Sequence, residues 1–287
     1  IAPVICAASA LNASSIANAT TRNPCSNEST IACIVTFSLK RDSATRSRWN
    51  VNAPLRLENV ALEDIDTDAP VDYFEEEEAQ WLAGLGMTLS RQTLDDPFRP
   101  GKGNRTEFGI EQVTVGGQSF QKVSAEVAGF FKLHEDFYGR KTTVQLKARA
   151  EYIPQDHGEV PFFERYYMGG SNFRGFKYRG VSPVGIRNDN GQLGSDPIGG
   201  NFSFFLGAEV QRPLYEDIVS IVGFIDTGTV SEDIAFDEYR VSVGFGFRLS
   251  VPQLSPAPLA FDFGFPIMKQ DTDETSFFSF SLDIPFR

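Results

Sequence analysis

The chain has 287 residues, with 38 acidic and 26 basic side chains and a formal net charge of −12 at pH 7. So acidic a chain is repelled by phosphate backbones, which excludes nucleic acid as an expected partner. The length suits one large β domain or two small ones. No apolar run approaches the ~18–20 residues that a membrane-spanning helix needs, so any crossing of a membrane would use strands.

Cysteine and histidine are scarce. Cys6, Cys25 and Cys33 all lie in the first 33 residues, and a long stretch without thiols suits an oxidising compartment. The two histidines, His134 and His157, have no cysteine at metal-ligand spacing, so no metal site is predicted. The sequence contains no GxSxG, Walker or dinucleotide-binding motif. We therefore expect no enzyme activity and no cofactor.

Residues 1–48 differ in composition from the rest of the chain. They are rich in Ala, Ser, Asn and Thr and show no periodicity, as low-complexity segments do. We predict a disordered or non-native lead here, with a cysteine-stapled cap as the alternative. Residues 49–287 are predicted to form one partial β-barrel domain.

Ten segments of alternating apolar and polar residues follow in chain order. This period of two is typical of strands with one apolar and one polar face. A run of glutamates at residues 75–78 predicts a solvated loop after the first of them. The predicted strands are residues 51–60, 81–90, 104–116, 118–133, 143–152, 202–212, 218–228, 239–249, 258–266 and 277–286.

The two faces of these strands have different chemistry. Phenylalanine supplies much of the apolar face in the last strands, whereas Glu209, Arg248, Asp262 and Asp283 fall on the opposite face. A soluble sandwich would need a large partner sheet to cover so many aromatic rings. Lipid removes that need, and the charged face would then line a wet interior. The predicted fold is an all-β, antiparallel transmembrane β-barrel.

Residues 162–180, with the sequence FFERYYMGGSNFRGFKYRG, interrupt the strand pattern. Gly169, Gly170 and Gly175 permit backbone conformations that other residues resist. Seven aromatic residues and three arginines surround them, which is too much to leave on a flexible tip. We predict a long loop folded inward, in which Arg174 pairs with a carboxylate. The alternative is an aromatic-rich surface loop.

Five segments along the chain carry a further pattern: LDDPF with GKG at residues 94–103, GGSNFRGF at 169–176, GAEV at 207–210, FIDTG at 224–228 and FFSFSLDIPFR at 277–287. These segments resemble motifs of the BamA-type outer-membrane assembly superfamily, the bacterial surface antigen family. The first resembles a turn of that family, the second its RGF/RGY loop and the third the acidic residue of its barrel wall. The fourth resembles its FxDxG strand, and the fifth its C-terminal targeting signal. Leu94 stands where arginine is usual, Asp283 where glycine is common, and Arg287 follows the final Phe286. The resemblance covers about residues 51–287.

The resemblance implies a sixteen-strand barrel preceded by periplasmic POTRA domains, of which this chain would hold about the last ten strands. Ten strands could close into a narrower barrel or could form an open curved sheet, and both alternatives remain. It implies the outer membrane of a Gram-negative-type bacterium, with lipid, unfolded barrel-protein clients and accessory lipoproteins as partners. The implied function is insertion of barrel proteins by strand pairing at a lateral seam. The alternatives are a two-partner-secretion pore and the barrel anchor of a fused enzyme.

The first set of expected site residues is a clasp between loop and wall. Arg174, followed by Gly175 and Phe176, is expected to reach back to Glu209 and Asp226, whose strand phases permit them to point inward. A guanidinium fork suits two carboxylates, and such bonds are strong where water is partly excluded. Bracing of the barrel and a role in assembly are both compatible with this clasp.

The second set lies at the C-terminus and is expected to act as the targeting signal. An aromatic girdle at the membrane interface is the alternative interpretation of these side chains. The set consists of Phe278, Phe280, Leu282 and Phe286.

Overall fold

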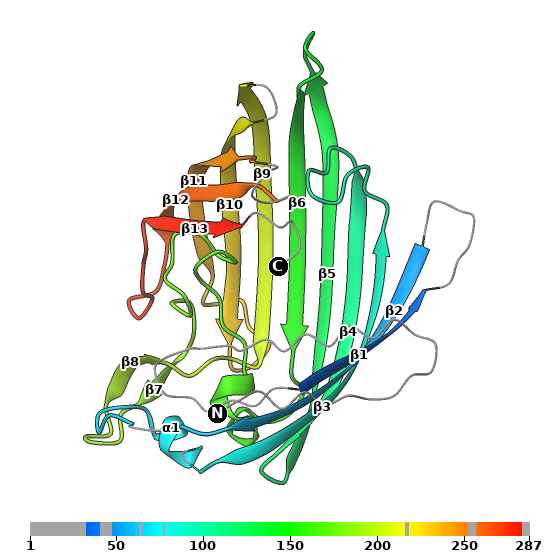
Figure 1. Ribbon diagram of the computed structural model, residues 1–287. Coiled ribbons are helices and arrows are strands. Elements are labelled where there is room, and N and C mark those ends of the chain that lie inside the picture. The colour runs from blue at the N-terminus through cyan, green and yellow to red at the C-terminus, as the bar shows by residue number, and fades with distance from the viewer. Residues whose placement is uncertain are drawn as a thin grey trace.

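The computed structural model describes residues 33–40, 48–62, 65–76, 78–215, 218–251 and 257–282. Eleven strands form one antiparallel sheet in the order β1-β2-β3-β4-β5-β6-β9-β10-β11-β12-β13, which curves strongly around a concave side (Figure 1). Their bounds are β1 Cys33–Lys40, β2 Arg48–Val60, β3 Gln80–Gln92, β4 Gly103–Val115, β5 Gln118–Glu135, β6 Lys141–Tyr152, β9 Phe202–Tyr215, β10 Val219–Ser231, β11 Arg240–Leu249, β12 Leu259–Met268 and β13 Phe278–Leu282.

All ten strands expected from the alternation are present, which confirms the all-β antiparallel fold. β1 was not expected: it lies within residues 1–48 and pairs antiparallel with β2. Residues 1–32 and 41–47 lie outside the described residues, so a lead there stays a prediction. β13 is described as far as Leu282, and the remainder of the last predicted strand lies outside the described part of the chain.

The sheet is open over the part of the chain that the structure describes. There, β1 pairs only with β2 and β13 only with β12. Each of these edge strands therefore leaves a row of backbone hydrogen-bonding groups without a strand partner. No helix within the described ranges has both the length and the apolar character that crossing a membrane requires.

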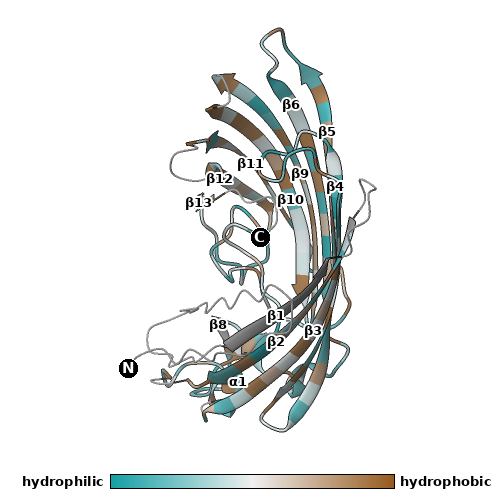
Figure 2. Cartoon of the chain, turned by 45° about the vertical axis from the view of Figure 1, so that its right-hand side comes forward, coloured by the Kyte–Doolittle hydropathy of each residue, from teal (hydrophilic) through white to brown (hydrophobic). Residues whose placement is uncertain are grey.

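Many large apolar side chains of the strands are exposed, and hydrophobic residues recur as brown bands along the strands in Figure 2. Trp81 and Leu85 on β3 are 67% and 62% exposed, and Phe280 on β13 is 57% exposed. On β12 the half-exposed Phe261 and Phe263 flank the buried Asp262. A continuous apolar outer band over a polar inner face is the arrangement of an outer-membrane barrel wall.

The connection between β6 and β9, residues 153–201, folds back along the concave side of the sheet and is called the inner loop below (Figure 1). It was expected to fold inward, but its short elements were not predicted. These are η1 His157–Glu159, η2 Phe162–Glu164 and the hairpin of β7 Val184–Ile186 with β8 Leu193–Pro197. A short helix, α1 Val71–Glu75, precedes β3 in the acidic stretch that was expected to be a loop.

Two separate apolar clusters join the inner loop to the sheet. Cluster 1 contains residues of β3, β4 and β5 and the beginning of the inner loop; cluster 2 contains the middle of the inner loop and residues of β9 and β10. Burial of apolar surface in each cluster stabilises the folded-back position of the loop. Cluster 1 is Leu82, Val113, Val115, Phe120, Ile153 and Val160, and cluster 2 is Met168, Phe173, Phe176, Val181, Phe205 and Val230.

Candidate functional site

A row of directly paired residues crosses the concave face of the sheet where the inner loop lies against it. The row runs from Gln145 on β6 through Glu209 on β9, Phe224 on β10 and Gly244 on β11 to Gly264 on β12. Directly opposed residues in a sheet point to the same face. The row therefore places an acid, an aromatic ring and two positions without side chains next to one another.

The missing side chains let the inner loop approach the sheet closely. A Cβ at Gly264 would collide with the backbone of Arg174 and Gly175, and a Cβ at Gly244 would collide with the ring of Phe224. Gly175 has a φ of 95°, a left-handed conformation that favours glycine. Its carbonyl accepts a hydrogen bond of 3.0 Å from the Ser276 amide. The loop backbone thus lies directly on β12.

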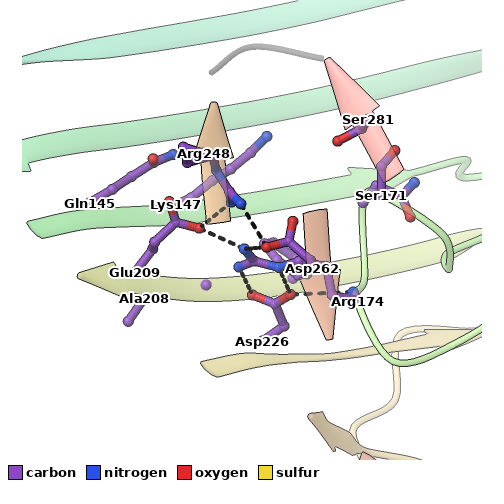
Figure 3. A pocket seen from close by; sticks show the side chains of 13 residues that line it. Gln145, Lys147, Ser171, Arg174, Ala208, Glu209, Asp226, Arg248, Asp262 and Ser281 are labelled. Atoms are coloured by element: carbon purple, nitrogen blue, oxygen red, sulfur yellow. Dashed lines mark hydrogen bonds and ion pairs between the residues drawn. The ribbon is translucent and has the colours of Figure 1, made fainter. Parts of the chain in front are cut away.

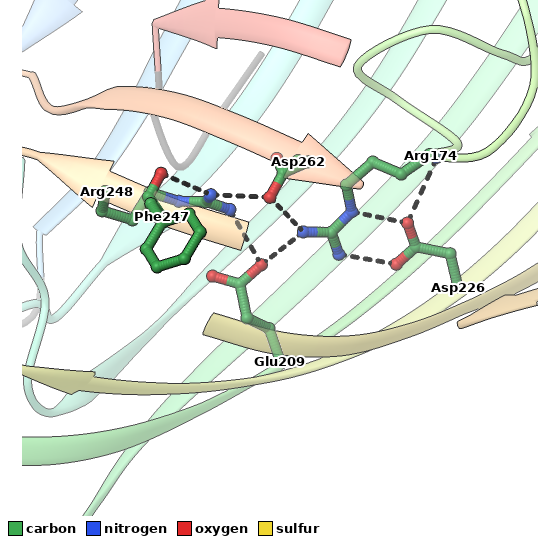
Figure 4. Close-up of polar contacts among 6 residues, drawn as sticks. All are labelled: Arg174, Glu209, Asp226, Phe247, Arg248 and Asp262. Atoms are coloured by element: carbon green, nitrogen blue, oxygen red, sulfur yellow. Dashed lines mark hydrogen bonds and ion pairs between the residues drawn. The ribbon is translucent and has the colours of Figure 1, made fainter. Parts of the chain in front are cut away.

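Arg174 reaches from this point across the row. Its Nε and Nη2 donate to the two carboxylate oxygens of Asp226 at 2.7 and 2.8 Å, and its Nη1 donates to Glu209 Oε2 at 2.6 Å (Figure 4). The guanidinium carbon lies 3.5 Å from the centroid of the Phe224 ring, within cation–π range. Burial opposes the charge of Arg174, but Asp226 and Glu209 raise its pKa above the ordinary value. The guanidinium therefore stays charged.

A second arginine extends the network. Arg248 on β11 donates to Asp262 on β12 at 2.7 Å and to Glu209 Oε2 at 3.3 Å. Arg174 Nη1 lies 4.0 Å from Asp262 Oδ1. Two arginines thus share three carboxylates, and one oxygen of Glu209 accepts from both. Strand phase predicted the inward position of Arg248 and Asp262, but not that they join Glu209.

The same network borders a small cavity of about 110 Å³, which Gln145, Lys147 and Ser281 also line (Figure 3). No group of three or more potential metal ligands occurs among the residues that the structure describes. The clasp has no nucleophile beside a general base; it pairs fixed charges. Such an arrangement can hold a segment in place, because each of these charges contacts at least one opposite charge.

Phe176, the remaining residue of the predicted clasp, is buried in cluster 2, where its ring centroid lies 4.9 Å from that of Phe173. Beyond it the inner loop is bonded to the connection between β12 and β13. Lys177 N donates to Glu274 O at 2.9 Å, and Glu274 N donates to Gly180 O at 3.0 Å. The clasp is therefore continuous with the last hairpin of the sheet.

The predicted C-terminal residues lie apart from the clasp. Phe278, Phe280 and Leu282 are 46%, 57% and 45% exposed and alternate along the outer face of β13. Phe286 lies outside the described residues. Their outward direction agrees with both the targeting signal and the aromatic girdle, so the two interpretations remain predictions.

A buried ion pair that the sequence did not predict also fixes the last hairpin. Arg240 on β11 donates from Nη2 to Asp273 Oδ1 at 2.9 Å and from Nε to Asp273 Oδ2 at 3.0 Å, and both side chains are almost fully buried. Asp273 lies in an irregular connection, where no alternation gives a side chain its direction. Only the folded arrangement brings it to β11.

Comparison with known proteins identifies relatives of this fold. Residues 10–286 match the Omp85 superfamily domain. The outer membrane protein assembly factor BamA of Nitratidesulfovibrio vulgaris is 27% identical over 254 residues, which cover 84% of this chain and 30% of the relative. The chain thus spans less than a third of that curated relative.

Two solved structures share the fold. The structure of BamA from Haemophilus ducreyi lacking POTRA domains 1–3 superposes with a TM-score of 0.69 at 18% identity, over 88% of this chain and 54% of that one. CdiB from Acinetobacter baumannii superposes with a TM-score of 0.60 at 13% identity, over 87% and 40%. Both likenesses concern the curved antiparallel sheet.

Proposed function

The chain belongs to the Omp85 superfamily, and from that membership we propose that it is part of an outer-membrane assembly factor that inserts β-barrel proteins into the membrane. The apolar outer band supports a membrane location with lipid against the convex face of the sheet. The relative named as an assembly factor supports the activity. Unfolded barrel proteins are the proposed clients, and accessory lipoproteins are proposed partners.

The observation that carries this proposal is an edge strand beside the clasp. Within the described ranges β13 pairs only with β12, which leaves one side of β13 open to an incoming strand. Pairing of an extended segment with an open sheet edge is β-augmentation. The inner loop is hydrogen-bonded to the connection that precedes β13, so the clasp would hold the receiving hairpin in position during insertion.

A charge exchange tests the role of the clasp. Arg174→Glu is expected to lower the amount of client barrel protein assembled in the outer membrane, because it sets a carboxylate against Glu209 and Asp226. The structure favours Asp226→Arg over Glu209→Arg as the compensating change, because a cation at position 209 would face Arg248. Glu159→Arg is the matched control, because it also reverses a charge on the inner loop and Glu159 is exposed.

The outcome separates the interpretations. Partial recovery of assembly in Arg174→Glu/Asp226→Arg supports pairing across the clasp. Normal client assembly in an Arg174→Ala variant would contradict the proposal. The alternative, a two-partner-secretion pore, predicts a steady ion conductance in planar bilayers that changes with Arg174 while client assembly does not.

The outward aromatic residues of the last strand have a proposed role of their own. We propose that Phe278, Phe280 and Leu282, together with Phe286, form the signal by which the cell's assembly machinery recognises this chain. The alternation of the first three on the outer face of β13 supports a motif that is read along one strand face.

A further inference from the structure

A second group of buried charges joins the inner loop to the opposite part of the sheet. Glu164, at the end of η2, accepts hydrogen bonds from Arg56 Nη1 and Nη2 on β2 at 2.9 and 2.8 Å, one to each carboxylate oxygen. Lys122 Nζ on β5 donates to Glu164 Oε2 at 3.1 Å and to the Glu164 carbonyl at 2.7 Å. The Glu164 side chain is only 5% exposed.

The contact between Arg56 and Glu164 is bidentate. A planar guanidinium that meets both oxygens of one carboxylate fixes direction as well as distance. Arg56 Nε lies 3.2 Å from Glu111 Oε1 on β4, an ion-pair contact without hydrogen-bond geometry. Lys122 Nζ lies 5.1 Å from the centroid of the Tyr166 ring. Strands β2 and β5 therefore contact one glutamate of the inner loop directly, and β4 adjoins it through Arg56.

The group shares none of these residues with the Arg174 clasp. It adjoins cluster 1 through Val160, four residues before Glu164, whereas Arg174 adjoins cluster 2 through Phe173 and Phe176. Between the two groups lie Gly169 and Gly170, both with positive φ, where the chain turns sharply. Each end of the segment thus has its own charges and its own apolar contacts.

We propose that Glu164 is a second anchor of the inner loop, which positions it on β2 and β5 independently of Arg174. The loop then acts as a brace across the concave side: one anchor holds the β2–β5 wall, and the other holds the β9–β12 wall. Glu164 is a positioning residue in this account and contacts no client. The inference does not depend on client insertion.

Two matched reporter cysteines test the independence of the anchors. Val160 in cluster 1 and Val181 in cluster 2 are both almost fully buried, so a cysteine at either position reacts only when its part of the loop leaves the sheet. Each is introduced separately into the full chain with Cys6, Cys25 and Cys33 replaced by serine. The protein is folded into phosphatidylcholine vesicles, and the rate of alkylation by a water-soluble maleimide is measured.

Glu164→Gln is expected to raise the alkylation rate of Val160→Cys at least tenfold and to leave that of Val181→Cys within twofold. Glu164 loses its charge but keeps its shape in this variant, so the packing of η2 is disturbed least. Arg174→Gln is expected to give the converse pattern. Glu159→Gln, which removes an exposed charge from the same loop, is the control and should change neither rate.

Either of two results would overturn the inference. Equal acceleration of both reporters by Glu164→Gln would mean that the loop leaves the sheet as one body with a single anchor. No acceleration at Val160→Cys would mean that Glu164 does not hold it. If Glu164→Gln does not fold into vesicles, Arg56→Gln removes the bidentate contact from the wall side and is judged by the same two rates. No client protein takes part, so the result is separate from the test of insertion.

Discussion

Near the start of the inner loop a glutamate meets two cations of the wall, whereas in the middle of the loop an arginine meets carboxylates of the wall. Glu164 is held from β2 and β5, and Arg174 from β9 and β10. Both side chains are buried, and both use a guanidinium fork, but the fork belongs to the wall at the first anchor and to the loop at the second. Opposite charges thus serve the same purpose.

The charge of the loop residue determines how each anchor responds to pH. A guanidinium carries five N–H donors and does not lose its proton in proteins. Arg174 can therefore join two carboxylates and stack on Phe224 at any ordinary pH. Glu164 accepts a proton in acid and would then lose its charge. The Arg174 anchor fixes two strands to each other through the loop, and the Glu164 anchor is the one whose loop residue titrates.

The largest expected effect comes from removing the shared cation. Arg174→Ala leaves Glu209 and Asp226 buried with fewer positive partners, and breaking a buried pair in this way costs about 3–5 kcal/mol in the free energy of unfolding. Arg174→Lys should recover only part of this, because an ammonium cannot bind two carboxylates through a fork. Urea unfolding in vesicles, followed by tryptophan fluorescence, measures both. A loss below about 1 kcal/mol for Arg174→Ala would place this anchor among ordinary surface ion pairs.

A somewhat smaller, pH-dependent effect is expected at the other anchor. Burial alone would raise the pKa of Glu164, but Lys122 and Arg56 lower it to about 2 from an ordinary value of 4.5. A lowered carboxyl pKa gives stability that is fully present above the unfolded value and is lost as pH falls through the folded value. A shift of this size corresponds to roughly 3 kcal/mol.

The difference in free energy of unfolding between the wild type and Glu164→Gln should therefore be constant from pH 7 to about pH 5 and should disappear near pH 2. Measuring this difference at each pH cancels the other carboxylates, which titrate in both proteins. A difference that fades between pH 7 and pH 5 would contradict a strongly paired Glu164.

The sequence predicted these two anchors unequally. Arg174, Glu209 and Asp226 were found because two of them lie on alternating strands, where phase gives direction, and because the surrounding motifs resemble a known family. Glu164 lies in a loop without periodicity, and its partner Arg56 is 108 residues away in the chain. No local pattern links residues so far apart, so only the folded register of β2 and β5 reveals the contact.

The same distinction applies to the fold. Strands of ten or more residues were predicted because alternation persists long enough to be recognised. β7 and β8 have three and five residues and α1 has five, which is too short for a period to be visible. The pairing of Arg248 with Asp262 depends on the register of β11 with β12, in which Gly246 rather than Arg248 is the direct partner of Asp262. Alternation gives the face of a side chain but not its neighbour.

The smallest expected effect concerns the close packing of the loop backbone on β12 at the Arg174 anchor. Gly264→Ala would place a Cβ against the backbone of Arg174 and Gly175, and overpacking of this kind costs about 1–3 kcal/mol. Gly223→Ala on β10 is the matched control, because a Cβ there meets no atom, and its effect should stay within about 0.5 kcal/mol. Equal losses at the two glycines in urea unfolding would mean that the loop backbone does not rest on β12.

The alkylation rate of Val181→Cys shows which part of the inner loop Gly264→Ala displaces. Gly264→Ala should accelerate alkylation of Val181→Cys and leave Val160→Cys unchanged, because the added methyl group lifts the segment around Arg174 without touching Arg56 or Lys122. The Arg174 anchor would then depend on close backbone packing as well as on charge. Acceleration at Val160→Cys instead would show that strain at β12 passes through Gly169 and Gly170, and the two anchors would have to be treated as one coupled unit.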